Sequence, residues 1–185
     1  DMVSLQDTGH AMIPVYDFAT ESRKDYRSLT IDESGVIIVE GIHGINPDFT
    51  EGVMRKNSYK LYISALTSIN IDDHNCLSTT DARLMRRLVR DFKYRGSSAE
   101  RTLGMWPDVR RGEDSYIFPY QEEADEIFNS ALIYELSVLK KYAEPILREV
   151  GQESIYYSSA VRLLTILSYF READDKEIPN TSLIR

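Results

Sequence analysis

The chain of 185 residues has little cysteine, no long apolar run and a shortage of positive charge. Its single cysteine, Cys76, cannot form a disulfide within the chain, so we expect a protein of the reducing cytoplasm. Because no apolar run approaches about 18 residues, we expect no membrane-spanning helix. The 22 lysines and arginines are outnumbered by 30 aspartates and glutamates, and the net charge of −8 argues against nucleic acid or an anionic membrane as a partner.

The hydrophobic pattern predicts an α/β chain. Residues 36–39 are four apolar β-branched residues in a row, which is typical of a strand buried on both faces of a parallel sheet. Further strands are expected at residues 59–64 and 127–128, whereas residues 1–12 are interpreted as a loop. Helices are expected at residues 81–94, 98–106, 131–149 and 153–170, with breaks at Pro107 and Pro119. Strands separated by helices favour a parallel sheet.

The predicted helix 81–94 and the residue after it carry an unusual concentration of positive charge. The basic residues are Arg83, Arg86, Arg87, Arg90, Lys93 and Arg95, and the only acid among them is Asp91. At about 100° per residue, Arg83, Arg87 and Arg90 share one stripe, while leucines, Met85, Val89 and Phe92 lie opposite. Arginine has forked donors suited to phosphate oxygens. The alternative is a solvated amphipathic helix whose arginines pair with carboxylates elsewhere in the chain.

Four short blocks, in a fixed order over residues 12–130, resemble one enzyme family. They are Pro14-Val15-Tyr16-Asp17-Phe18 with Arg23, then Glu40-Gly41-Ile42, then the segment from Asp81 to Gly96, and finally Phe118-Pro119 with Ala124-Asp125. The ordered set resembles the uridine kinase and phosphoribulokinase family, most closely its bacterial uridine kinase-like branch. The resemblance implies part of a three-layer P-loop kinase fold with a parallel sheet. Residues 1–130 would then form the substrate and lid side, and residues 131–185 a C-terminal helical extension packing on the same domain.

The resemblance also implies an activity and its partners. The intact protein would phosphorylate the 5′-hydroxyl of a uridine-like or cytidine-like nucleoside, using ATP and Mg²⁺. By position, Arg87 would lie near the nucleoside and its phosphate acceptor. Arg90 and Arg95 would be lid arginines facing the transferring phosphoryl group, with Arg83 a further candidate. The apolar stripe of residues 132–150 is interpreted as core, with an interface in a homo-oligomer as the alternative.

On the substrate side, Tyr16 matches the family tyrosine that packs against the base, and Arg23 belongs to the same block. Glu40 is expected at the carboxyl end of a strand, where open α/β sheets place ligands, and by resemblance it is a site carboxylate near magnesium. His43 lies close to it in sequence and is a further candidate ligand.

The sequence also departs from the family pattern. Glu21, Ser97 and Met105 stand where the family has a histidine, an arginine and a glutamine, so uridine itself is not fixed as the substrate. No G-x-x-x-x-G-K-S/T loop occurs in these residues. We therefore expect the loop upstream of Asp1 in a longer protein, and no ATP turnover by this chain alone. The alternatives are a catalytically degenerate nucleotide- or phosphate-binding module and a structural role for the helices of residues 131–170 in self-association.

Overall fold

The computed structural model describes residues 2–17, 20, 22–53, 55–67 and 69–182. The chain forms two compact units, each built from two stretches of sequence. The first unit comprises Asp1–Tyr62 and Asp114–Glu126, and the second comprises Ile63–Glu113 and Ile127–Arg185. Of the sequence motifs above, Phe18 and Glu21 lie outside the described residues.

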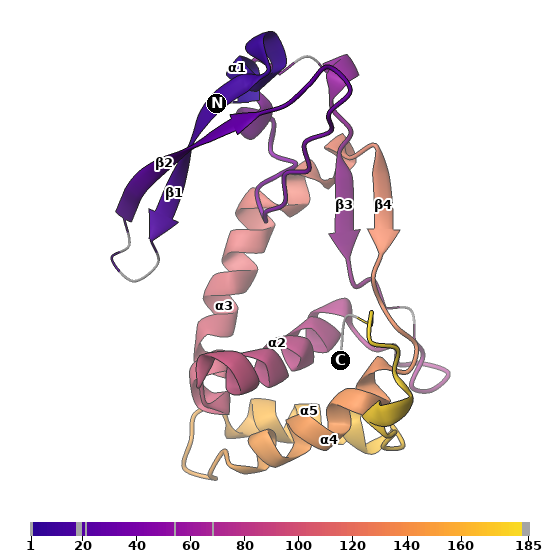
Figure 1. The fold of residues 1–185 in the computed structure, drawn as a ribbon. Coiled ribbons are helices and arrows are strands. Elements are labelled where there is room, and N and C mark those ends of the chain that lie inside the picture. The colour runs from indigo at the N-terminus through magenta and orange to yellow at the C-terminus, as the bar shows by residue number, and fades with distance from the viewer. Residues whose placement is uncertain (1, 18–19, 21, 54, 68, 183–185) are drawn as a thin grey trace. The chain divides into compact units, whose positions relative to one another are not determined.

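The first unit begins with a short helix and an antiparallel hairpin (Figure 1). Helix α1 (Met2–Thr8) is followed by β1 (His10–Asp17) and β2 (Ser22–Thr30), so the expectation of a loop over residues 1–12 is wrong. Gly9 makes the turn between helix and strand with a φ of 68°, which a side chain would disfavour. Strand β2 is polar and almost entirely exposed, whereas β1 is mostly apolar, is interrupted by Pro14 and buries only Ala11. Neither strand therefore shows the regular alternation of polar and apolar residues that would predict it from the sequence.

Residues 36–39 do not form the buried strand that their sequence predicts. They have no regular secondary structure, and Val36 and Ile38 are 87% and 89% exposed. A strand forms only when a neighbouring strand satisfies its backbone N–H and C=O groups, and no described segment pairs with these residues. Consequently Glu40 is not at the end of a strand but in an exposed loop, ahead of the 3₁₀ turns η1 (Pro47–Thr50) and η2 (Arg55–Asn57).

The parallel sheet that the sequence predicts is present in another part of the chain. Strands β3 (Leu61–Ser64) and β4 (Glu126–Asn129) run in the same direction (Figure 1), which confirms the strands expected near residues 59–64 and 127–128. The Asp125 amide donates to the Lys60 carbonyl and the Ser130 amide to the Ser64 carbonyl, each at 2.8 Å. This register is that of a parallel pair. The α/β class is therefore confirmed, with helices following the sheet toward the C-terminus.

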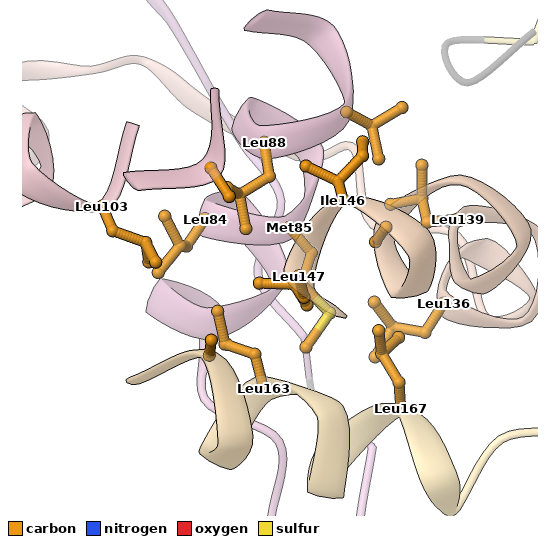
Figure 2. Close-up of a cluster of buried hydrophobic side chains, with 14 of the residues drawn as sticks. Leu84, Met85, Leu88, Leu103, Leu136, Leu139, Ile146, Leu147, Leu163 and Leu167 are labelled. Atoms are coloured by element: carbon orange, nitrogen blue, oxygen red, sulfur yellow. The ribbon is translucent and has the colours of Figure 1, made fainter. Parts of the chain in front are cut away.

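Four helices build the core of the second unit: α2 (Thr79–Arg95), α3 (Ala99–Tyr116), α4 (Glu135–Arg148) and α5 (Tyr157–Ser168). Helix α4 packs against both α2 and α5. Figure 2 shows side chains from all four helices meeting in one cluster; those labelled are Leu84, Met85, Leu88, Leu103, Leu136, Leu139, Ile146, Leu147, Leu163 and Leu167. The apolar stripe expected on the fourth helix therefore lies in the core, as interpreted from its spacing.

The ends of these helices differ instructively from those expected. Ser78 caps α2, because its hydroxyl accepts a hydrogen bond from the Asp81 amide at 3.0 Å. Gly96 ends α2 in the left-handed conformation. Helix α3 continues past Pro107 to Tyr116, so the expected break there is wrong. A proline removes only one helical hydrogen bond, and Leu103 and Trp106 hold this part of α3 against the core. After α3 come the 3₁₀ turn η3 (Phe118–Glu123) and, near the C-terminus, η4 (Asp175–Glu177).

No helix within the described ranges combines the length and the hydropathy that crossing a bilayer requires.

Candidate functional site

The arginines of helix α2 occupy the side of the helix that the core leaves uncovered. Leu84, Met85 and Leu88 are buried against α4 and α5, as the helical period predicts. Phe92 was expected on this apolar side but is about half exposed, because it lies in the last turn, beyond most of the packing. The arginines emerge between these apolar positions, and their carboxylate partners divide them into two groups.

Two of the arginines each pair with a buried carboxylate on another helix. Arg86 donates hydrogen bonds to both carboxylate oxygens of Glu135 through Nε and Nη2, and its Nη2 also donates to the Ser130 carbonyl at 2.8 Å. Glu135, in the first turn of α4, is only 2% exposed, so this pair fastens α2 to α4. Arg83 forms an ion pair with Glu113 of α3, which is also buried. These contacts are those that the solvated-helix alternative expected, and they give Arg83 and Arg86 structural partners.

The other three arginines converge on one carboxylate. Asp91 is 1% exposed, and its Oδ1 accepts hydrogen bonds from Nε and Nη2 of Arg90 at 3.1 and 3.0 Å. Nη1 of Arg95 lies 3.5 Å from the same oxygen, and Nε of Arg87 lies 3.1 Å from Oδ2. Three positive groups thus surround one negative group, which leaves a local surplus of two positive charges at the end of α2.

This cluster, which we call the Asp91 cluster (Arg87, Arg90, Arg95 and Asp91), has unused hydrogen-bonding capacity. The contact between Arg87 Nε and Asp91 Oδ2 lacks hydrogen-bond geometry, and both atoms are buried without another hydrogen-bond partner. The side chains of Arg90 and Arg95 are 49% and 56% exposed, so their remaining N–H groups face solvent. Exposed guanidinium forks with surplus charge are a suitable arrangement for binding the oxygens of a phosphate group.

The predicted substrate residues Tyr16 and Arg23 are brought together in the first unit. They face each other directly in the β1–β2 ladder, next to the irregularity in register between Val15 and Tyr16. Directly opposite residues of an antiparallel pair have side chains on the same face. Both side chains are exposed, and just beyond them Lys24 and Asp17 form an ion pair of 2.9 Å. The hairpin therefore presents an aromatic ring and a cation at one position.

Glu40 and His43, the other predicted residues of the first unit, are both exposed in a loop. The ring of His43 makes an edge-to-face contact with Tyr116, with centroids 6.3 Å apart. Among the residues that the structure describes, no group of three histidine, cysteine, aspartate or glutamate side chains could hold a metal ion. The arrangement around Glu40 therefore does not fit a preformed magnesium site.

Sequence reasoning missed the carboxylates that organise the arginines. The sequence shows Asp91 only as the single acid of the basic helix, and it gives no role to Glu113 and Glu135. For Asp91 a signal existed, because Arg87 precedes it and Arg95 follows it by four residues, a spacing that places all three on one side of a helix. Glu113 and Glu135 belong to other helices, so no local pattern could have found them.

Fold and site together define an α/β protein with parallel strands and an arginine cluster suited to a phosphate group. A family model described as phosphoribulokinase / uridine kinase family matches residues 1–136. The chain therefore belongs to the phosphoribulokinase and uridine kinase family, which confirms the resemblance carried by the four sequence blocks.

Curated relatives agree with the family. Uridine kinases of Staphylococcus aureus strains JH9 and Newman are each 32% identical to this chain over 118 residues. The matched region is 62% of this chain and 48% of each relative, so the chain spans about half the length of the curated relatives it matches. No solved structure matches the chain significantly.

Proposed function

We propose that this chain supplies the nucleoside-binding and phosphate-facing part of an ATP-dependent nucleoside kinase. The observation that carries the proposal is the Asp91 cluster, where three arginines share one buried carboxylate in a protein whose net charge is −8. Family membership and uridine kinase relatives support phosphoryl transfer as the chemistry. The product would be a nucleoside 5′-monophosphate, with uridine or cytidine as the first substrates to test.

The charge and exposure of the α2 arginines suggest a separate role for each in phosphoryl transfer. Arg90 and Arg95, whose guanidinium groups are half exposed, would bind oxygens of the transferring phosphoryl group. Arg87 is more buried, and it would approach the acceptor end of the same group. Phosphoryl transfer depends mainly on positioning and on neutralising negative oxygens, which such arginines supply. We do not assign Arg83 to this role, because its ion pair with the buried Glu113, which Arg110 also contacts, ties its side chain to α3.

On the nucleoside side, we assign Tyr16 and Arg23 to substrate binding. The exposed Tyr16 ring offers a flat apolar surface for a base, and Arg23 opposite it offers donors for carbonyl or hydroxyl oxygens. His43, in its contact with Tyr116, stays a candidate ligand in the same unit. The exposed free thiol of Cys76 is compatible with a reducing cytoplasm, which we include in the proposal.

ATP, when bound, would supply the phosphoryl group, and magnesium commonly accompanies it. The 185 residues contain no glycine-rich phosphate loop, and the surroundings of Glu40 do not fit a metal site. We therefore assign no residue to magnesium, and none to ATP beyond the arginines at its transferring phosphoryl group. From this we expect that the chain alone binds nucleoside and phosphate without transferring phosphate.

The test is a transfer assay with the complete gene product, in which uridine and cytidine are separately incubated with ATP and the monophosphates are quantified by chromatography. Arg90→Ala should lower kcat/KM by about 10²-fold or more, because a donor to developing negative charge is lost. The matched control is Arg111→Ala, which removes an exposed arginine paired with Asp108 and should leave the rate unchanged. An Arg90→Ala enzyme with undiminished kcat/KM would refute the assignment.

A second candidate function is a binding module without turnover. It is favoured by Ser97, which stands where the family has an arginine and is buried, with its amide donating to the Asp91 carbonyl at 3.0 Å. Ser97 thus completes the helix end and supplies no charge to a ligand. Met105, also a departure, likewise brings no donor. Calorimetry showing nucleotide binding by the complete gene product, with no monophosphate formed under the same conditions, would favour this function over the kinase.

A further inference from the structure

We infer that Asp91 is a positioning residue that orders the three arginines of its cluster for phosphate binding. The inference rests on the proposed function, since it explains how the proposed phosphate-binding arginines are held. Asp91 itself is 1% exposed and has no access to a ligand, so its effect on binding is exerted through Arg87, Arg90 and Arg95.

The geometry shows how one carboxylate can hold three arginines. Arg90 reaches Asp91 Oδ1 with two nitrogens of its fork, which fixes the plane of its guanidinium group. Arg95 shares the same oxygen, and Arg87 approaches the other oxygen from the preceding turn. Without a central negative charge, three positive side chains within two turns would repel one another and separate.

The backbone of Asp91 adds a second restraint. Its carbonyl accepts hydrogen bonds from the amides of Gly96 and Ser97, so the residue that holds the arginines also closes the end of α2. Arg95 stands directly before this turn. The position of its side chain therefore depends on Asp91 twice, through the carboxylate and through the helix end.

The positioning role and the net charge predict opposite changes in anion affinity when Asp91 is replaced by asparagine. Asp91→Asn removes a negative charge beside a phosphate site, and charge alone would then strengthen anion binding by about fivefold or more. If Asp91 acts by ordering the arginines, the same substitution should weaken anion binding by about tenfold, because the charge-assisted hydrogen bonds from Arg90 and the ion pairs with Arg87 and Arg95 are lost together. The direction of the change distinguishes the two effects.

The experiment is calorimetric titration of the complete gene product with inorganic pyrophosphate, at one fixed ionic strength. The matched control is Asp108→Asn, the same chemical change at an exposed aspartate that pairs with Arg111, and it should not alter pyrophosphate affinity. Weaker binding by Asp91→Asn alone is the expected result. Unchanged or tighter binding overturns the positioning role.

Arg90→Ala separates this inference from the proposed function. If Arg90→Ala binds pyrophosphate as the unchanged protein does, the phosphate site itself is wrong. If Arg90→Ala weakens binding and Asp91→Asn does not, the phosphate site stands and only the positioning role falls.

The positioning role of Asp91 can also be tested on the unaltered protein, which keeps the inference testable if Asp91→Asn does not fold. Side-chain NMR can follow hydrogen exchange at the Nε–H groups of Arg90 and Arg111. The Arg90 Nε–H donates to a buried oxygen and should exchange about tenfold more slowly than that of the exposed Arg111. Equal exchange rates would overturn the inference.

Discussion

Truncation should destabilise the fold much more in one group of α2 arginines than in the other, and Arg86→Ala is the most informative change. It removes both donors to Glu135, which is 2% exposed, and one donor to the Ser130 carbonyl. Removing one partner of a buried ion pair costs about 3–5 kcal/mol, because the remaining charge is buried without a partner. Arg90→Ala should cost at most about 1 kcal/mol, because its side chain is half exposed and Asp91 keeps two other arginines.

Urea unfolding measured by fluorescence gives these free energies directly. Trp106 is the only tryptophan of the chain and packs against the core of the second unit, where α2 and α4 also lie. With a slope of about 1–3 kcal/mol per molar urea, Arg86→Ala should lower the midpoint by about 1–5 M, and Arg90→Ala by much less. Arg111→Ala, at an exposed pair, is the matched control and should lie within about 0.5 kcal/mol of the unchanged protein.

The refuting result is equally specific. If Arg86→Ala destabilises no more than Arg111→Ala, the Arg86–Glu135 pair does not hold α2 to α4, and the division of the arginines by their partners is wrong. If Arg90→Ala lowers the free energy of unfolding as much as Arg86→Ala does, the Asp91 cluster is a structural element. Its exposed arginines would then not form the proposed phosphate-binding site.

Three further predictions concern stability and ionisation. Leu88→Ala should destabilise the second unit by about 2–5 kcal/mol in the same urea assay, because Leu88 is fully buried, and a cost under about 1 kcal/mol would contradict the packing of Figure 2. Gly96→Ala should cost about 1 kcal/mol through its left-handed φ alone, since a Cβ there meets no atom within 4 Å; a neutral result in thermal unfolding would show that the helix end rearranges. The pKa of Asp125 is lowered to about 2 by hydrogen bonds from Arg55 and the Lys60 amide, so this carboxylate stabilises the fold above its unfolded pKa near 3.8 and loses that contribution as pH falls to about 2. The NMR shift of the Lys60 amide should titrate with a midpoint of about 2, and a midpoint near 4 would contradict the pairing.

The sequence predicts best where the physical cause is local. Helix α2 is recognisable from the period of Leu84 and Leu88 and from Gly96 at its end, and the structure agrees to within a few residues. The hairpin of β1 and β2 could not be recognised in this way, because β2 is polar and the apolar run of β1 is interrupted by Pro14, so neither strand has a periodic apolar side. Residues 36–39 fail for the opposite reason. Their apolar side chains satisfy the local condition for a strand, but the partner strand is a condition that no local pattern contains.

In the candidate site, too, the features with a local cause are predictable from the sequence and those that depend on distant residues are not. A helical projection of the sequence places the arginines on one side of α2, but it cannot say which of them are neutralised. That distinction depends on Glu113 and Glu135, which reach α2 from helices that follow later in the chain. The sequence predicts Tyr16 and Arg23 as substrate ligands, but it does not predict that they lie opposite each other, because that pairing depends on the register of the hairpin.

The core of Figure 2 has a practical meaning for protein engineering. The family model ends at residue 136, yet Leu139, Leu147, Leu163 and Leu167, which cover the apolar side of α2, all come after that point. A chimera that joins residues 1–136 to the C-terminal part of another family member would therefore contain the arginines without the surface on which their helix packs. The other family member has to be chosen for how its helices pack against Leu84, Met85 and Leu88. Under the proposed function, directed evolution of substrate choice should leave α4 and α5 unvaried while positions on the hairpin and on the exposed side of α2 are changed.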